Sequence, residues 1–215
     1  MTGSLNELEI LVKRATRGAG WSWGIAEEAG KSARWLASRG FPAGRLVLAW
    51  LQHGEGIPYR ERIPADPRSS RWAAGSGFLC PVCTGCALSD RGTGTPPVFP
   101  LHLVAVATPL LLVPFLERLA RALRQPVCLE GEGIRWVLDG ADGWQAEAGT
   151  GLQAATADLI LQPVPESPPP RVERFYRVDW APDDKSGLES FAHRIFAPAS
   201  IGHQSGAGAG LRDND

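Results

Sequence analysis

The sequence Gly77-Phe-Leu-Cys-Pro-Val-Cys-Thr-Gly-Cys-Ala-Leu-Ser-Asp90 divides this chain into two parts of different character. Before it, apolar residues repeat at helical spacing. After it, short apolar runs bounded by glycine, proline and aspartate are typical of strands. The stretch also holds three of the four cysteines, at two-residue gaps, so it is the segment whose spacing indicates chemistry.

Three helices are predicted in the part before this stretch. Ser4-Leu-Asn-Glu7 has the pattern of a capping box, which predicts the start of a first helix. A second helix is expected from Trp23 to Ser38, on a stripe of alanines, and a shorter one from Arg45 to Gln52. We therefore expect a helical N-terminal unit over residues 1–54.

The part after the cysteines predicts a mixed β-sheet with one or two packing helices. The fold class is thus α+β, with α/β as the alternative. Strands are expected at 99–106, 127–130, 134–138, 158–164 and 171–180, and helices at 109–124 and 186–196. The domain plan is a helical unit (1–54), a loop rich in Pro, Gly and Arg (55–77), an α+β core (78–196) and a glycine-rich tail (197–215).

Composition and charge limit the binding partners and the cellular location that we expect for this chain. Twenty-two Lys and Arg against 23 Asp and Glu leave a net charge of −1, with no basic run, so we expect no nucleic-acid partner. The first twenty residues carry charges and no long apolar segment, so we expect no secretory signal and a cytoplasmic location. Residues 92–116 are uncharged but hold five prolines, which favours a buried strand and helix over a membrane span. High Gly, Pro and Arg with three lysines is typical of a bacterial protein from a GC-rich genome.

The cysteines fit a metal site. Cys80, Cys83 and Cys86 form C-x2-C-x2-C, with Cys128 as a candidate fourth ligand. Closely spaced thiolates converging on one centre suit an iron–sulfur cluster better than zinc, since structural zinc usually takes ligand pairs from two separate segments. Zinc would need Cys128, His53 or His102 to complete its tetrahedron.

Two other interpretations of the cysteines stay open. Cys80-Pro-Val-Cys83 has the C-P-x-C spacing of redox-active thiols, in which a helix N-terminus lowers the pKa of the first thiol. The simplest interpretation is that all three are small buried apolar residues, because free cysteine is among the most buried residue types.

Two further segments are candidates for binding. Arg60, Arg62, Arg68 and Arg71 lie in the 55–77 loop and suit an anion such as phosphate or carboxylate, or they are simply solvated. In the tail, glycine amides suit an anion, and Asp213, Asp215 and His203 a divalent cation. The simpler interpretation of the tail is a mobile terminus, or an arm that packs on a partner subunit or on a second copy of the chain in a homo-oligomer.

Both ends of the chain carry a family resemblance. Ser22-Trp-Gly-Ile-Ala-Glu-Glu-Ala-Gly30 and Gly206-Ala-Gly-Ala-Gly-Leu-Arg-Asp-Asn-Asp215 resemble a family of proteobacterial proteins classed only as a domain of unknown function. The resemblance implies no catalytic residue, cofactor or substrate.

Three functional hypotheses follow. The first is a small-molecule-binding protein or minor metabolic enzyme, with its site between the cysteines and the arginine-rich loop. The second is a subunit that binds an iron–sulfur cluster or zinc through its cysteines. The third is a noncatalytic assembly partner that docks through its apolar stretches and tail.

Overall fold

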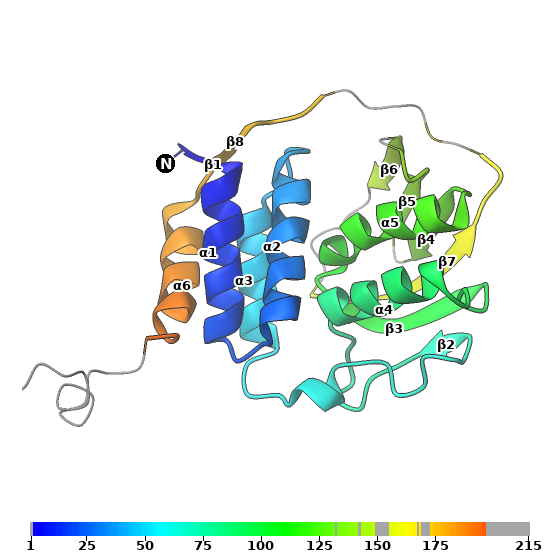
Figure 1. Ribbon diagram of the computed structural model, residues 1–215, viewed down its shortest axis with the longest axis horizontal. Helices are drawn as coiled ribbons and strands as arrows, with labels where there is room; N and C mark the ends of the chain where they lie inside the picture. Colours follow the sequence, from blue (N-terminus) through cyan, green and yellow to red (C-terminus); the bar gives the residue numbers. More distant parts are fainter. Residues whose placement is uncertain are drawn as a thin grey trace, which may run out of the picture.

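The computed structural model describes residues 2–131, 133–141, 143–148, 155–166, 168 and 173–196. Within these residues the chain forms a group of helices, a six-stranded mixed sheet with two helices packed on it, and a two-stranded antiparallel sheet (Figure 1). The predicted α+β class is confirmed. The glycine-rich tail, 197–215, lies outside the described residues.

The three predicted N-terminal helices form close to their expected positions. They are α1 (Leu5–Gly18), α2 (Trp23–Ala37) and α3 (Ala43–His53). The alanine stripe of α2 is buried, as its spacing predicts, and the small side chains let α1 and α2 pack along their length. A fourth helix, α6 (Pro182–His193), packs on α1 from the other side (Figure 1).

The chain therefore returns to its helical unit at the end. The short strand β8 (Arg177–Asp179) pairs antiparallel with β1 (Thr2–Ser4), and α6 follows it. The sequence pattern predicts a strand over 171–180 and places both elements in the 78–196 core. They join the N-terminal helices because Leu188 and Phe191 of α6 bury their side chains in the same core. A Cβ at Gly18 would overlap the backbone carbonyl of Phe191, so glycine permits this close approach.

The main sheet has the strand order β2-β3-β7-β4-β5-β6. Only β2 and β3 run parallel, and the other neighbours are antiparallel. The predicted hairpin at residues 131–133 joins β4 to β5. The bounds are β2 Arg71–Trp72, β3 Leu101–Ala107, β4 Val127–Gly131, β5 Ile134–Leu138, β6 Trp144–Ala148 and β7 Thr156–Pro163.

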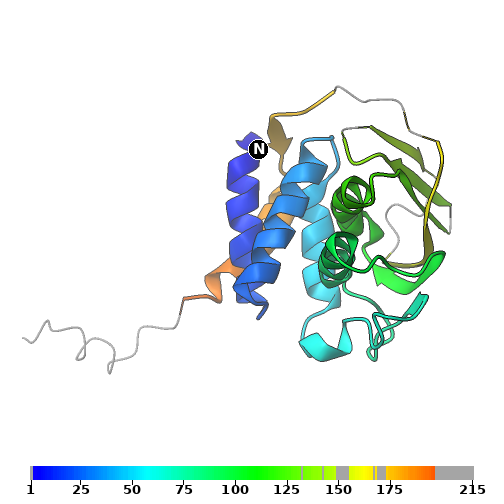
Figure 2. The same ribbon diagram turned by 45° about the vertical axis from the view of Figure 1, so that its right-hand side comes forward.

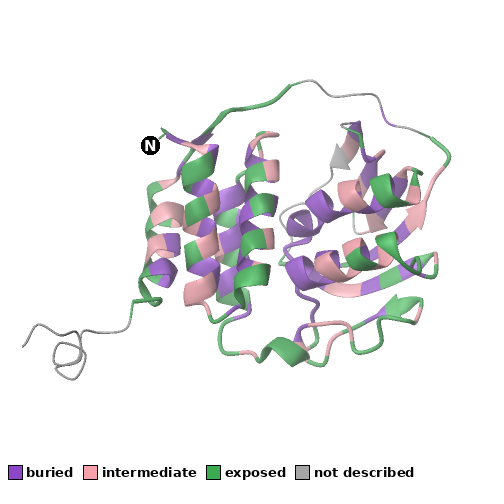
Figure 3. Ribbon diagram, in the orientation of Figure 1, coloured by how far each residue is buried: buried purple, intermediate pink, exposed green. Residues whose placement is uncertain are grey.

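Two helices, α4 (Pro81–Thr93) and α5 (Val113–Leu123), lie side by side between the sheet and the helical unit (Figure 2). Their N-terminal turns are the buried ends (Figure 3). The uncharged run forms β3, the 3-10 turn η2 (Pro109–Leu112) and the start of α5, as predicted. Among the described residues, no helix has both the length and the apolar character needed to cross a bilayer.

The capping box at the start of α1 gives a first testable prediction. The Glu7 amide donates to the Ser4 hydroxyl at 3.1 Å, and the Ser4 amide donates to the Glu7 carboxylate at 2.6 Å. These bonds to Ser4 hold the pKa of Glu7 below its usual value. Ser4→Ala should therefore lower the free energy of unfolding by about 1 kcal/mol in urea titrations. Ser4→Thr keeps the acceptor and should retain most of that stability; an equal loss in both variants would contradict the capping role.

Candidate functional site

The C-x2-C-x2-C segment begins a helix instead of forming a loop. Cys80 is the N-cap of α4, and Pro81 follows at the first helical position, where its missing N–H costs nothing. The Cys80 sulfur accepts a hydrogen bond from the Cys83 amide at 3.5 Å, so it takes the place that a serine or aspartate oxygen usually occupies. This is the local geometry that the redox interpretation of the sequence expects.

The three thiols of this segment differ in acidity. Burial alone raises the pKa of Cys80, but hydrogen bonds from the Cys83 thiol and from the Cys83 and Val82 amides, with the charge of Arg62, bring it below the usual value. The pKa of Cys83 is raised, first by its hydrogen bond to Cys80 and then by burial. Burial raises the pKa of Cys86 to about 12. Cys80 is thus the thiol that ionises most readily.

The structure does not gather the predicted metal ligands around one centre. Across the residues it describes, no group of three or more Cys, His, Asp and Glu side chains is placed to hold a metal ion. Cys128 lies on β4, with its thiol 4.0 Å from a Glu130 oxygen, and His53 packs edge-on against Phe78. The iron–sulfur or zinc hypothesis stays a prediction from spacing alone.

Arg62 is the one predicted anion-binding residue that is buried, with 7% of its surface exposed. It follows the 3-10 turn η1 (Tyr59–Glu61), and its carbonyl accepts a hydrogen bond from the Cys80 amide at 2.8 Å. Its guanidinium lies 4.0 Å from the ring centre of Trp21, and Nη1 donates to the Gly54 carbonyl at 2.9 Å. Within the described parts of the chain it forms no ion pair, and its Nε has no hydrogen-bond partner. Burial lowers the pKa of Arg62, but an arginine stays charged at neutral pH.

The other three arginines of the predicted set do not join it. Arg60, Arg68 and Arg71 are exposed. Arg71 begins the short strand β2, and the Arg68 amide donates to the Asp66 carboxylate. The loop therefore does not bring the four arginines to one site.

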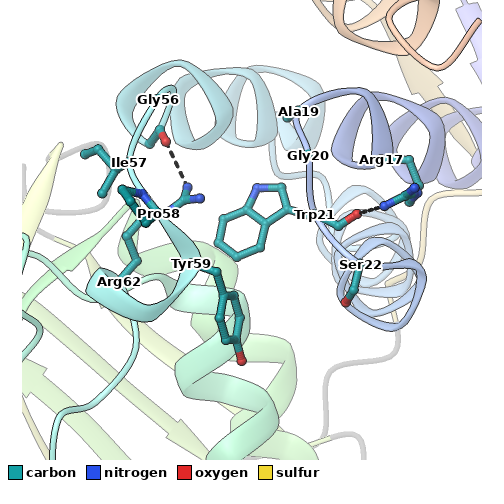
Figure 4. A pocket seen from close by; sticks show the side chains of 11 residues that line it. Arg17, Ala19, Gly20, Trp21, Ser22, Gly56, Ile57, Pro58, Tyr59 and Arg62 are labelled. Carbon is teal, nitrogen blue, oxygen red and sulfur yellow. Dashed lines mark hydrogen bonds between the residues drawn. The ribbon is translucent and has the colours of Figure 1, made fainter. Parts of the chain in front are cut away.

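A cavity of about 700 Å³ lies beside Arg62. It is formed by the end of α1, the link to α2 and the segment that follows α3. Its lining is Arg17, Ala19, Gly20, Trp21, Ser22, Gly54, Gly56, Ile57, Pro58, Tyr59 and Arg62. Figure 4 shows Trp21 in the middle of this lining, with the Arg62 guanidinium on one side and Arg17 on the other.

The cavity is cationic. Its lining includes two arginines and no aspartate or glutamate. Arg17 donates to the Trp21 carbonyl and lies over the Trp23 ring at 5.0 Å; like Arg62, it has a buried Nε without a hydrogen-bond partner among the described residues. Tyr59 is 52% exposed at the cavity edge, and its pKa is raised by burial and by the neighbouring Cys83. The arrangement favours a negatively charged ligand.

Sequence reasoning found part of this site. Arg62 was predicted as a member of the arginine-rich loop. Arg17 and Tyr59 were missed because no local pattern marks them: each reaches the cavity only when α1 packs beside the segment after α3. The short sequence distance from Arg17 to Trp21 was the available signal, since only four positions separate them.

One comparison with known proteins bears on this region. Residues 3–75 match the model of a family described as "Protein of unknown function (DUF3726)". This confirms the resemblance to an uncharacterised family for the N-terminal part. The match covers every residue that lines the cavity and ends before Cys80. No curated protein and no solved structure matches the chain.

Proposed function

We propose that this chain is a cytoplasmic small-molecule-binding protein whose cavity holds an anionic ligand, a carboxylate or a phosphate. The main support for this proposal comes from Arg62. Its buried guanidinium lies on the cavity wall and forms no ion pair with any described residue. A buried charge is costly unless a partner of opposite charge compensates it. The Trp21 face and the Gly54 carbonyl supply part of that compensation, and a bound anion supplies more.

The size and lining of the cavity support the same proposal. Its volume lies within the range typical of small-molecule sites, about 300–1,000 Å³. Ile57, Pro58 and the exposed ring of Tyr59 add apolar surface to the lining. This mixture favours a ligand that joins an anionic group to a ring or another flat apolar part. The four free cysteines fit a reducing compartment.

The test is calorimetric titration of the full chain with benzoate, phenyl phosphate and benzamide. Benzoate or phenyl phosphate should bind, and which of them binds more tightly distinguishes carboxylate from phosphate recognition. Benzamide has a similar shape but no charge and should bind much more weakly. Equal binding of benzamide, or binding of neither anion, would refute the proposal.

Arg17→Gln should weaken anion binding about tenfold, equivalent to about 1.4 kcal/mol, because it removes one of the two cavity charges. The matched control is Arg60→Gln, which removes a neighbouring charge that is exposed and outside the cavity lining. Titrations of the two variants should therefore differ. Equal weakening would mean that the overall charge, and not the cavity, attracts the anion.

A further inference from the structure

We propose that Cys80 and Cys83 are a redox-active pair, which a small hydroperoxide closes to an intramolecular disulfide in the first turn of α4. Cys80 is the attacking sulfur and Cys83 the resolving one. The pair lies outside the cavity lining, and its reaction requires no ligand there.

The geometry brings the two sulfurs together. An N-cap side chain folds back over the amide of the third helical residue, and here the Cys80 sulfur lies 3.5 Å from the Cys83 nitrogen. Because the cap already holds Cys80 in place, closing the disulfide needs mainly a rotation of the Cys83 side chain within the usual bridge geometry.

The surroundings decide which sulfur attacks. The nucleophile in thiol chemistry is the thiolate, favoured by a helix N-terminus and by a nearby cation. Cys80 has both: it caps α4, and its amide binds the carbonyl of Arg62 at 2.8 Å, so the charge of Arg62 is close enough to lower the pKa of Cys80. Cys83 is favoured as the protonated partner, because its interaction with Cys80 and its burial raise its pKa. A second observation also points to an anionic sulfur. Arg62 is buried and has no carboxylate partner among the described residues.

The reaction balances with one hydroperoxide and the two thiols. The Cys80 thiolate attacks the terminal peroxide oxygen and the O–O bond breaks. The leaving hydroxide, or the alkoxide of an organic hydroperoxide, takes a proton to become water or an alcohol. Cys80 is then a sulfenic acid. The Cys83 sulfur attacks the Cys80 sulfur, the S–O bond breaks, and hydroxide leaves as water with the Cys83 proton. A small-molecule dithiol returns the pair to its reduced state by exchange.

Because both sulfurs are buried, the oxidant that reaches them must be small. Cys80 is 0% exposed and Cys83 5%, so a protein disulfide cannot reach either sulfur in this conformation. Hydrogen peroxide, close to water in size, requires much less opening. Cys86 is one turn further along α4 and less buried, but its raised pKa keeps it a thiol. It is therefore a matched control on the same helix.

The experiment treats the reduced full chain with hydrogen peroxide, then denatures it and blocks the remaining thiols with N-ethylmaleimide. Intact mass should show two thiols lost, and dithiothreitol should restore them. In Cys86→Ser, the tryptic peptide of residues 72–91 contains only Cys80 and Cys83, so a bridge in it is unambiguous. We expect that bridge to form as fast as in the unmodified chain.

Two further variants assign the roles. Cys83→Ser should stop at the sulfenic acid, which dimedone traps at Cys80, and Cys80→Ser should give no bridge and no trapped adduct. Circular dichroism melts check that both variants fold. A bridge that involves Cys86 or Cys128, or oxidation of folded Cys80→Ser as fast as of the unmodified chain, would overturn the proposal. So would the absence of any bridge in the folded, unmodified chain.

Discussion

Gly85→Ala should destabilise the protein by about 1–3 kcal/mol, the usual cost of overpacking a core, although alanine normally stabilises a helix interior relative to glycine. Gly85 lies in α4, and an added Cβ would overlap the ring of Phe115 on α5. Phe115 is fully buried, so the ring has little room to move aside. The steric term should therefore exceed the gain of about 0.5–1 kcal/mol that the exchange gives elsewhere.

The matched control is Gly24→Ala in α2, where an added Cβ meets nothing within 4 Å. That variant should be as stable as the unmodified chain or slightly more so. Urea unfolding of both variants measures the difference. If Gly85→Ala is no less stable than Gly24→Ala, α4 and α5 do not pack as closely as described here. Because α4 carries the cysteine pair, the result also tests how firmly that pair is positioned.

The elements of the fold that sequence predicts best are those with local signals. The capping box fixes the start of α1, and the glycines at 131 and 133 fix a hairpin because both adopt positive φ angles. No local sequence signal predicts where α6 packs in the fold. Its apolar residues Leu188 and Phe191 indicate a buried face but not which helices cover that face. Long-range packing determines which helices cover that face, and it places the end of the chain against the N-terminal unit.

The cysteine segment shows the same limit at the candidate site. Its spacing is compatible with a metal loop, a redox helix or packed thiols. Proline after Cys80 predicts a helix start, and the structure has one. What the sequence does not contain is the neighbour: Arg62 lies eighteen positions earlier, and a main-chain hydrogen bond brings it next to Cys80. The charge of Arg62 lowers the pKa of Cys80 and acts in the same direction on Cys83, so the N-cap position of Cys80 is what distinguishes it from Cys83.

Arg62 connects the cavity to the cysteine pair, so Arg62→Met should affect both. Methionine has a similar length and can remain against Trp21, whereas the charge and the hydrogen bond to Gly54 are lost. Anion binding should fall at least tenfold, about 1.4 kcal/mol. Stability should change little, because methionine removes the cost of burying a charge without an ion-pair partner but leaves the Gly54 carbonyl without its Arg62 hydrogen bond. Calorimetric titration and urea unfolding measure the two effects separately.

The same variant should slow the reaction of Cys80 with hydrogen peroxide. The charge of Arg62 lowers the pKa of Cys80, so its removal raises that pKa. At a given pH below the pKa, a higher value means a smaller thiolate fraction and a slower reaction. The midpoint of the oxidation rate against pH should therefore move to higher pH in Arg62→Met. Arg62→Lys keeps a positive charge and should lie between the variant and the unmodified chain.

Anion binding and the pH profile of Cys80 oxidation can change independently in this variant, so together they distinguish the two proposals. Loss of anion binding with an unchanged pH profile would keep the cavity as a ligand site and remove Arg62 from the chemistry of Cys80. A shifted profile with unchanged binding would do the reverse. If neither changes while the chain stays folded, Arg62 is only a packing residue, and its contacts with Trp21 and Gly54 are the reason for its burial. A single substitution at the residue shared by both sites thus tests whether the buried cation serves an external anion, the Cys80 thiolate, or both.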